Sequence, residues 1–472
     1  MKISSVRLVN FKKFADVEID ISSDLTLFLG PNSSGKSSVI KALLGLKQTI
    51  LPSNESEGFS TQGDYVDLGT YHDFVYSHNP KNLVSLGVTL QSDVAPVYIY
   101  SRVGTMRHLV RGIKYLITFD YNANTEQPRV HSERVTVSVE GIEPDLVINI
   151  ERKKTRDGFR FRVNKEFCDA IDPYLRPDQR RRSQLWVKGL DLVHAGRLTF
   201  KRVPNKGEYV PDIATGNWIP TLQSQLHNAL ANELYYIGPI RSAPSRNYIR
   251  TSHSSAVGPR GEYTASVLAN LDKRRRKVTT GTSGIQVQYN FLRSALMALF
   301  PGKEFSPQTI HELIRLEFFD SVLDVRGKRR GESIMDVGFG FSQIFPVIVQ
   351  LAVMPKGSTL IVEQPELHLH PLAQTSLAKV FRLAAVSGKR ILAETHSDHL
   401  IRGLQLEVSE RRRDQNAGLD GSQVKVVYID GKQQEPTLLE MGDDGEFTSG
   451  WPEGFMDLSY QVVRKIVQNR LS

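Results

Sequence analysis

The segment from Gly30 to Ser38 reads GPNSSGKSS and matches the phosphate-binding pattern G-x-x-x-x-G-K-[ST] in full. An apolar run, Leu25 to Leu29, precedes it, and a helical pattern, Lys36 to Leu46, follows it. In this context the loop and helix N-terminus cradle phosphates, the lysine reaches the terminal phosphates and the serine holds Mg²⁺. We expect phosphate contacts from Gly30, Pro31, Asn32, Ser33, Ser34, Gly35, Lys36, Ser37 and Ser38, with Ser37 as a metal ligand.

A carboxylate closes a second apolar strand far downstream. The segment STLIVEQPELHLHP, from Ser358 to Pro371, places Glu363 where an acid of a nucleotide site meets the metal. Further along, RILAETHSDHLIR places His396 just after another apolar strand. The spacing predicts that Glu363 binds metal and that His396 contacts the terminal phosphate.

A glycine turn lies between these regions, in the segment DVGFGFSQIFPVIVQL. Gly338 and Gly340 give flexibility, and Ser342 and Gln343 stand at the start of an apolar helix. A phosphate contact and a plain helix cap by Ser342 fit this local sequence equally well. The order of the motifs favours the phosphate contact, so Gly340, Ser342 and Gln343 are candidate nucleotide contacts.

Phosphate loop, long insertion, glycine turn, acid-ended strand and histidine, in this order, resemble the ABC-type ATPase heads of the OLD, RecF and SMC families. Finer features resemble standalone bacterial ATPases grouped with the OLD-like enzymes. These features are VRLVNFKKF near the start, VDLGTYHDFV (Val66 to Val75), YYIGPIRSAPSRNY (Tyr235 to Tyr248), EQPELHLHP and EGFMDLSY (Glu453 to Tyr460).

The resemblance implies a protein that binds and hydrolyses ATP with Mg²⁺. In such heads the signature segment of one subunit caps ATP bound to another, so Gly338 to Gln343 would act in trans, within a dimer or a larger ring. Several members of the wider group are ATPase subunits of anti-phage systems such as Septu and PARIS. This implies a sensor or scaffold that controls an effector protein, such as a nuclease encoded nearby, and that responds to nucleic acid or a phage protein.

The chain departs from the family pattern directly after Glu363. Many ABC ATPases carry a second carboxylate there to orient the attacking water, whereas this chain has Gln364. Since an amide is a poor proton acceptor, we expect slow hydrolysis, or a base supplied by Glu366 or by the partner. The family's glutamine that links Mg²⁺ to the second lobe corresponds in position to Gln62.

Basic residues leave a second function open. Arg241 and Arg246, in a proline-bracketed loop, fit contacts to phosphate or a neighbouring subunit as well as surface salt bridges. The runs Arg180 to Arg182, Lys273 to Lys277 and Arg411 to Arg413 fit phosphate contacts of a RecF-like DNA-repair ATPase, although most such runs are solvated loops. A transporter subunit fits least, because of the β-rich insertion.

The elements that must position these residues indicate an α/β protein, an ABC-ATPase head with a P-loop core and an inserted β-rich and helical lobe. Strands are expected at 2–10 and 16–21, a strand-rich insertion at 86–163, helices at 285–300, 306–318, 342–354 and 371–386, and strands at 359–363 and 390–395. The predicted division is 1–80 and 336–472 for the core halves, 81–235 for the inserted lobe and 236–335 for a helical connection.

Composition limits the cellular compartment and the kinds of site that we expect. The chain has 472 residues, 40% hydrophobic and 24% charged, with a net charge of +9. Its apolar runs are too short for a membrane span, and its single cysteine, Cys168, fits a reducing cytoplasm and cannot supply a structural zinc site. Asp443 and Asp444 are adjacent, unlike the separated pair of a Toprim nuclease, so we expect destructive chemistry to come from a partner.

Overall fold

The structure, a computed structural model, describes residues 1–51, 59–92, 97–100, 107–152, 159–163, 185–188, 199–202, 218–251, 255–276, 284–320, 331–414, 417–431, 435–452, 465 and 468–469. The chain forms two compact units. The first comprises Met1–Ser22 and Ser37–Leu234, and the second comprises Ser23–Lys36 and Tyr235–Ser472. The division of the chain into core halves, insertion and connection stays a prediction.

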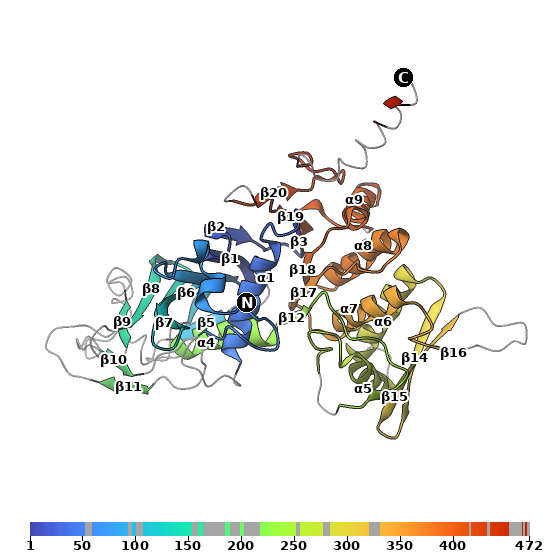
Figure 1. The fold of residues 1–472 in the computed structure, drawn as a ribbon, viewed down its shortest axis with the longest axis horizontal. Coiled ribbons are helices and arrows are strands. Elements are labelled where there is room, and N and C mark those ends of the chain that lie inside the picture. Colours follow the sequence, from blue (N-terminus) through green and yellow to red (C-terminus); the bar gives the residue numbers. More distant parts are fainter. Residues whose placement is uncertain are drawn as a thin grey trace, which may run out of the picture. The chain divides into compact units, whose positions relative to one another are not determined.

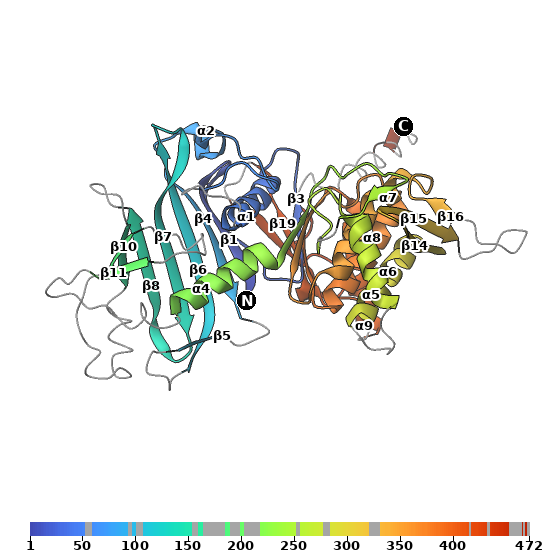
Figure 2. The ribbon, with the colours of Figure 1, turned by 90° about the horizontal axis from the view of Figure 1, so that it is seen from below.

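The first unit is built on a long antiparallel sheet. Ten described strands form it in the order β11-β10-β9-β8-β7-β6-β4-β1-β2, with β5 paired to β6. The strands are β1 (Lys2–Phe11), β2 (Phe14–Asp20), β4 (Val84–Gln91), β5 (Val97–Tyr100), β6 (Arg107–Asn122), β7 (Gln127–Val139), β8 (Ile142–Arg152), β9 (Phe159–Val163), β10 (Leu185–Lys188) and β11 (Thr199–Arg202). Helices α1 (Lys36–Ile50) and α4 (Trp218–His227) lie along one face (Figure 2).

Alternation of side chains explains this sheet. In β7 the residues Val135, Val137 and Val139 are buried, whereas the residues between them are less so. Such a period of two gives each strand one face toward the core and one toward solvent. The short elements of this unit are α2 (Tyr71–Phe74), the 3-10 helix η1 (Tyr76–His78) and the π-helix η5 (Asn228–Asn232).

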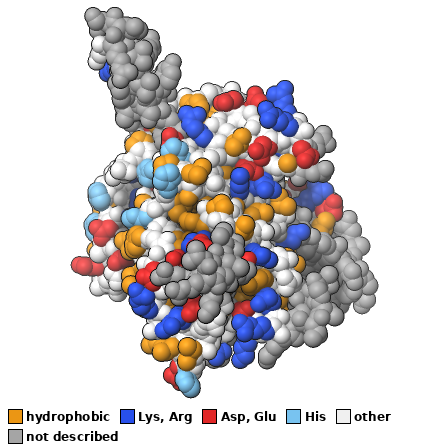
Figure 3. Space-filling model, turned by 90° about the vertical axis from the view of Figure 1, so that its right-hand side faces the viewer, with side chains coloured by type: hydrophobic (Ala, Val, Ile, Leu, Met, Phe, Trp, Pro, Cys, Tyr) orange, Lys and Arg blue, Asp and Glu red, His pale blue; other side chains and the backbone are white. Residues whose placement is uncertain are grey.

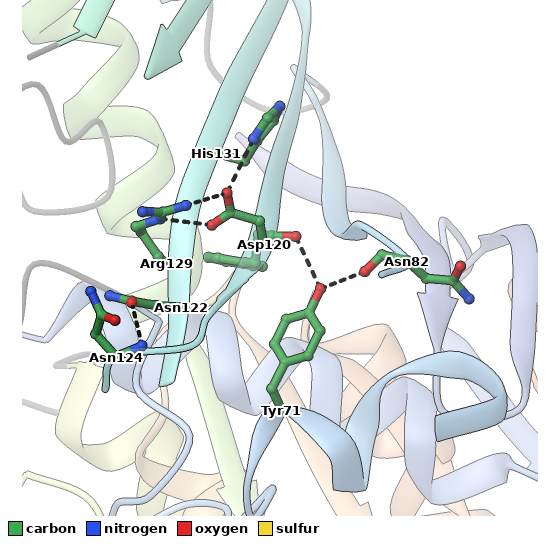
Figure 4. Close-up of polar contacts among 8 residues, drawn as sticks. Tyr71, Asn82, Asp120, Asn122, Asn124, Arg129 and His131 are labelled. Carbon is green, nitrogen blue, oxygen red and sulfur yellow. Dashed lines mark hydrogen bonds and ion pairs between the residues drawn. The ribbon is translucent and has the colours of Figure 1, made fainter. Parts of the chain in front are cut away.

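A polar cluster ties the segment before β4 to the end of β6 (Figure 4). The Tyr71 hydroxyl lies 2.7 Å from the backbone oxygen of Asn82 and 3.2 Å from that of Phe119. Burial raises the pKa of Tyr71 to about 12. Arg129 donates two hydrogen bonds to Asp120, of 2.9 and 2.8 Å. These bonds fix one end of the β6 and β7 hairpin.

The second unit carries a six-stranded sheet in the order β12-β17-β18-β3-β19-β20. Its strands are β3 (Leu25–Leu29), β12 (Leu234–Ile237), β17 (Thr359–Glu363), β18 (Arg390–Glu394), β19 (Val424–Tyr428) and β20 (Thr437–Glu440). The central four, β17, β18, β3 and β19, run parallel to one another. Their carboxyl ends therefore lie at one edge of the sheet, where ligands bind in open α/β sheets.

Helices cover this sheet and a smaller one. They are α5 (Thr264–Arg276), α6 (Gly284–Leu299), α7 (Phe339–Val353), α8 (Pro371–Val386), α9 (Asp398–Arg413) and the 3-10 helix η6 (Gly421–Gln423). Helices α7, α8 and α9 lie on the same side of the six-stranded sheet (Figure 1). Their apolar faces and the buried strands form one hydrophobic core. The smaller sheet has the order β13-β15-β14, with β16 paired to β15; its strands are β13 (Tyr248–Ile249), β14 (Lys303–Ile310), β15 (Leu313–Asp320) and β16 (Gly331–Ser333).

The predicted α/β class is confirmed, and β3, β17 and α8 begin and end where the sequence places them. The helix predicted over 306–318 is wrong, because this segment forms most of the antiparallel pair β14 and β15. Phe305 and Pro307 on β14 face Phe318 and Leu316 on β15 in a period of two. Pro307 is tolerated because β14 ends the order of its sheet, where a missing N–H costs no ladder bond.

Candidate nucleotide site

The phosphate loop connects β3 to α1 through a backbone that requires glycine. Gly30 has φ of 140°, and a Cβ there would lie 1.9 Å from the backbone oxygen of Ile429. The rim residues Pro31, Asn32 and Ser33 are exposed, whereas the Ser34 hydroxyl is buried with no hydrogen-bond partner among the described residues. The unsatisfied Ser34 hydroxyl fits a loop shaped for a polar ligand.

Lys36 lies folded over this loop. Its ammonium donates to the backbone oxygens of Gly30 at 3.0 Å and Pro31 at 2.7 Å, and the residue is only 3% exposed. Burial lowers the pKa of Lys36, and the negative charge of Glu394 acts in the opposite direction. Ser37 is partly exposed and Ser38 is buried at the start of α1.

Glu363 ends β17, as the sequence predicts, and its carboxylate is held by a tyrosine. The Tyr236 hydroxyl donates a hydrogen bond of 2.7 Å to Glu363. Burial raises the pKa of Tyr236, and the charge of Glu363 raises it further. Tyr236 lies in β12, the neighbour of β17, and the signal in the sequence is the pair of tyrosines in that strand.

Glu394 is a second acid at this edge that sequence reasoning missed. It ends β18, is 6% exposed, and lies opposite Glu363 in the parallel register. Its negative charge acts to raise the pKa values of Lys36, Tyr236 and His396. The signal was present, because RILAE repeats the pattern of TLIVE, an apolar strand closed by a glutamate.

The loops that follow these two strands are joined to each other. The Gln364 N–H donates to the backbone oxygen of Glu394 at 2.7 Å, and Gln364 has φ of 45°. Glu366, 7% exposed, accepts a bond of 2.8 Å from the backbone N–H of His396, and its other carboxylate oxygen has no hydrogen-bond partner among the described residues. Partial burial lowers the pKa of His396, and the charge of Lys36 lowers it further. The ring is therefore neutral at pH 7.

The glycine turn leads into α7. Gly338 has φ of 109°, and Phe339, the first residue of the helix, is 53% exposed. Ser342 and Gln343, by contrast, are 5% and 4% exposed, and the Ser342 hydroxyl donates to the backbone oxygen of Phe339 at 2.7 Å. The exposed part of the segment is therefore its backbone at the helix start rather than these two side chains.

Gly340 makes a close approach that joins α7 to the loop after β17. A Cβ at this position would lie 2.2 Å from the backbone oxygen of His368. Replacing Gly340 by alanine is expected to lower the free energy of unfolding by about 1–3 kcal/mol through overpacking. Gly284→Ala is the control, since its Cβ would meet no described atom within 4 Å. Equal denaturation midpoints for Gly340→Ala and the unchanged chain would contradict the close approach.

The two arginines of the proline-bracketed loop differ. Arg241 is 6% exposed and donates to the backbone oxygens of Gln343 at 3.1 Å and Glu363 at 2.9 Å. Arg246 instead forms an exposed ion pair with Asp336 at 3.0 Å, one of the two alternatives that the sequence leaves open. Gln62, in the first unit, is exposed, and its backbone pairs with Asp67.

The described members of the basic runs differ in their partners. In α5, Arg275 and Arg276 pair with the buried Asp272 at 3.0 and 2.7 Å. Arg412 and Arg413 are exposed at the end of α9. On the face in Figure 3, basic side chains are interspersed with acidic ones. The predictions on Cys168, 180–182, Lys277 and 453–460 lie outside the described residues.

No group of three or more His, Cys, Asp or Glu side chains in the described part of the chain is placed to hold a metal ion by itself. None of the described helices combines the length and apolar character needed to cross a bilayer.

Two family models match separate parts of the chain. Residues 1–97 match the model described as "AAA ATPase domain". Residues 242–402 match the model described as "AAA domain, putative AbiEii toxin, Type IV TA system". The first contains the phosphate loop, and the second contains Glu363, Glu394 and His396. Together they indicate a P-loop ATPase. No curated protein matches the chain significantly.

Solved structures similar to the chain include three SMC heads, each 10% identical to it. The SMC head domain from Thermotoga maritima has a TM-score of 0.36, over 93% of this chain and 99% of the other. A second SMC head, bound to the C-winged helix domain of ScpA, has a TM-score of 0.42 over 93% and 98%. A third, from Pyrococcus furiosus with an extended coiled coil and bound to the C-terminal domain of ScpA, has a TM-score of 0.37 over 98% and 99%.

Proposed function

We propose that this P-loop ATPase binds and hydrolyses ATP with Mg²⁺, and that the ATP cycle controls an assembly of several copies that holds or releases an effector protein. The convergence of Lys36, Glu363 and His396 within one unit is the observation that carries the proposal. The phosphate loop precedes α1, and Glu363 ends β17. The positive charge of Lys36 lowers the pKa of His396. Three distant motifs thus meet at the carboxyl edge of one parallel sheet.

ATP would bind with its phosphates along Gly30 to Ser37. Lys36, which now donates to two loop carbonyls, would exchange them for terminal phosphate oxygens. Glu363 would hold Mg²⁺, and the ion when bound neutralises charge on the phosphates. Ser37 and Gln62 stay predicted metal ligands. Tyr236 orients the Glu363 carboxylate for this role through its 2.7 Å hydrogen bond.

The residues after the two acid-ended strands would face the terminal phosphate. The backbone of His396 is positioned by the bond from its amide N–H to the Glu366 carboxylate, and a neutral imidazole can donate to a phosphate oxygen. Gln364 can position water, but its amide cannot take a proton, which supports slow hydrolysis unless another carboxylate assists.

Assembly is proposed because the glycine turn ends in an exposed helix N-terminus. Gly338 and Phe339 are exposed, and free backbone N–H groups at such an end attract phosphate. We infer that Gly338 to Gly340 of one copy contact the nucleotide of another through the backbone. Ser342 and Gln343 support this turn from within, as their burial indicates.

The effector role is supported by resemblance rather than by geometry. The description of the model matched by residues 242–402 names a toxin of a Type IV toxin–antitoxin system. Together with the segments similar to ATPase subunits of Septu and PARIS, this supports a role in bacterial anti-phage defence in the cytoplasm. The effector would be a separate protein such as a nuclease, and the trigger a nucleic acid or a phage protein.

Mixing two inactive variants tests assembly in trans. Lys36→Met lacks the phosphate-binding lysine, and Phe339→Glu places a negative charge at the exposed start of α7. Each variant alone should lose ATPase activity, whereas their mixture should regain about a quarter of the unchanged rate if subunits pair randomly as dimers. Light scattering of the unchanged chain should show a larger mass with ATP than without it.

Full activity of Phe339→Glu alone, or a mixture as inactive as its parts, would contradict the trans arrangement. Val386→Glu is a matched control, since this side chain is 68% exposed at the end of α8. The effector is tested by purifying the chain with its neighbouring gene products, with and without ATP. If the same amount of complex were recovered with and without ATP, ATP control would be refuted.

A further inference from the structure

The order of the strands gives β18 a central place in the nucleotide site. β18 lies between β17, which carries Glu363, and β3, which leads into the phosphate loop. All three strands are parallel. The end of β18 therefore lies between the loop that binds phosphates and the acid that binds metal. Whatever side chain ends β18 is placed close to the terminal phosphate.

Glu394 is that side chain. Paired residues of neighbouring strands project to the same face of a sheet, so Glu394 and Glu363 are directed to one side. Glu394 is 6% exposed, and burial of a carboxylate requires compensating partners. The negative charge of Glu394 raises the pKa of Lys36, the group that would reach the terminal phosphate.

The backbone also joins Glu394 to the position that lacks an acid. The Gln364 backbone N–H donates to the backbone oxygen of Glu394 at 2.7 Å, so the start of the loop after Glu363 is fixed beside the end of β18. Gln364 and Glu394 thus occupy neighbouring places at one edge. A carboxylate at position 364, where many ABC ATPases carry one, would therefore start from the backbone beside the end of β18.

We propose that Glu394 orients the attacking water and accepts its proton, a role resting on the ATPase function proposed above. The water oxygen forms a bond to the γ-phosphorus, and the bond from that phosphorus to the β,γ-bridging oxygen breaks. The electron pair of that bond leaves on ADP. The water proton passes to Glu394 and then to solvent, and inorganic phosphate is released.

The test separates ATP binding from the chemical step. Glu394→Gln should bind ATP within about threefold of the unchanged chain, while single-turnover hydrolysis at saturating ATP and Mg²⁺ falls by about 100-fold or more. Glu394→Asp keeps the charge beside Lys36 but shortens the side chain, so it should fold and hydrolyse at an intermediate rate. Adding Gln364→Glu to Glu394→Gln should restore part of the lost rate.

Hydrolysis at the unchanged rate in Glu394→Gln would overturn this role. So would a loss of ATP binding as large as that of Lys36→Met, because it would show a part in binding rather than in the chemical step. Glu407→Gln is the control for loss of a buried glutamate; Glu407 is 2% exposed and pairs with Arg382 at 2.7 Å. If the unchanged chain neither bound nor hydrolysed ATP, the ATPase proposal itself would fail instead.

Discussion

Replacing Lys36 by methionine is expected to weaken ATP binding by about 10- to 100-fold, because a charge-assisted hydrogen bond contributes about 1.5–3 kcal/mol. Methionine keeps most of the buried volume and removes only the ammonium. Hydrolysis should fall further than binding, since the lysine charge also stabilises the transition state. Calorimetric titration and a phosphate-release assay measure the two effects.

The lysine also bonds to the backbone of its own loop, so the fold of the variant must be checked. The ammonium donates to the oxygens of Gly30 and Pro31, and these carbonyls lose a donor in the variant. Lys41→Ala is a matched control, because Lys41 lies in the same helix and carries the same charge but is less buried. A folded Lys36→Met protein that binds ATP as tightly as Lys41→Ala would refute the nucleotide site.

Local patterns suffice where an element and its motif are contiguous. The run Leu25 to Leu29 and the loop GPNSSGKS give strand, turn and helix together, since every interaction that defines them is close in sequence. The same holds for Thr359 to Glu363, whose apolar residues are all buried. Burial of a parallel strand on both faces leaves a continuous apolar run that is readily recognised.

Sequence reasoning fails where distant strands decide the outcome. Lys303–Ile310 forms a strand because it pairs with Leu313–Asp320. Without knowledge of that pairing, Ser306 followed by Pro307 suggested the start of a helix. Glu394 was missed for the same reason. Its importance depends on β18 lying between β3 and β17, an order that no local pattern reveals. The burial of Ser342 likewise depends on packing of α7 within the core.

Replacing Arg241 by alanine is expected to lower the free energy of unfolding by about 3–5 kcal/mol. Burial lowers the pKa of Arg241 to about 10, so the buried charge itself costs free energy. That cost is offset by bonds to the backbone oxygens of Gln343, Glu363 and Gln364. Truncation leaves these oxygens without their donor, and an unmet buried acceptor costs more than a formed bond gains.

Arg246→Ala supplies the matched comparison, because it removes the same side chain from the same loop. The pair between Arg246 and Asp336 is exposed, so its loss should cost at most about 1 kcal/mol. Arg241→Lys should recover little stability, since an ammonium cannot span carbonyls on two segments as a planar guanidinium does. Because Arg241 joins the start of α7 to the end of β17, its loss should slow hydrolysis as well as lower the denaturation midpoint. Equal midpoints for Arg241→Ala and Arg246→Ala would show that α7 and the Glu363 loop are held together without this arginine.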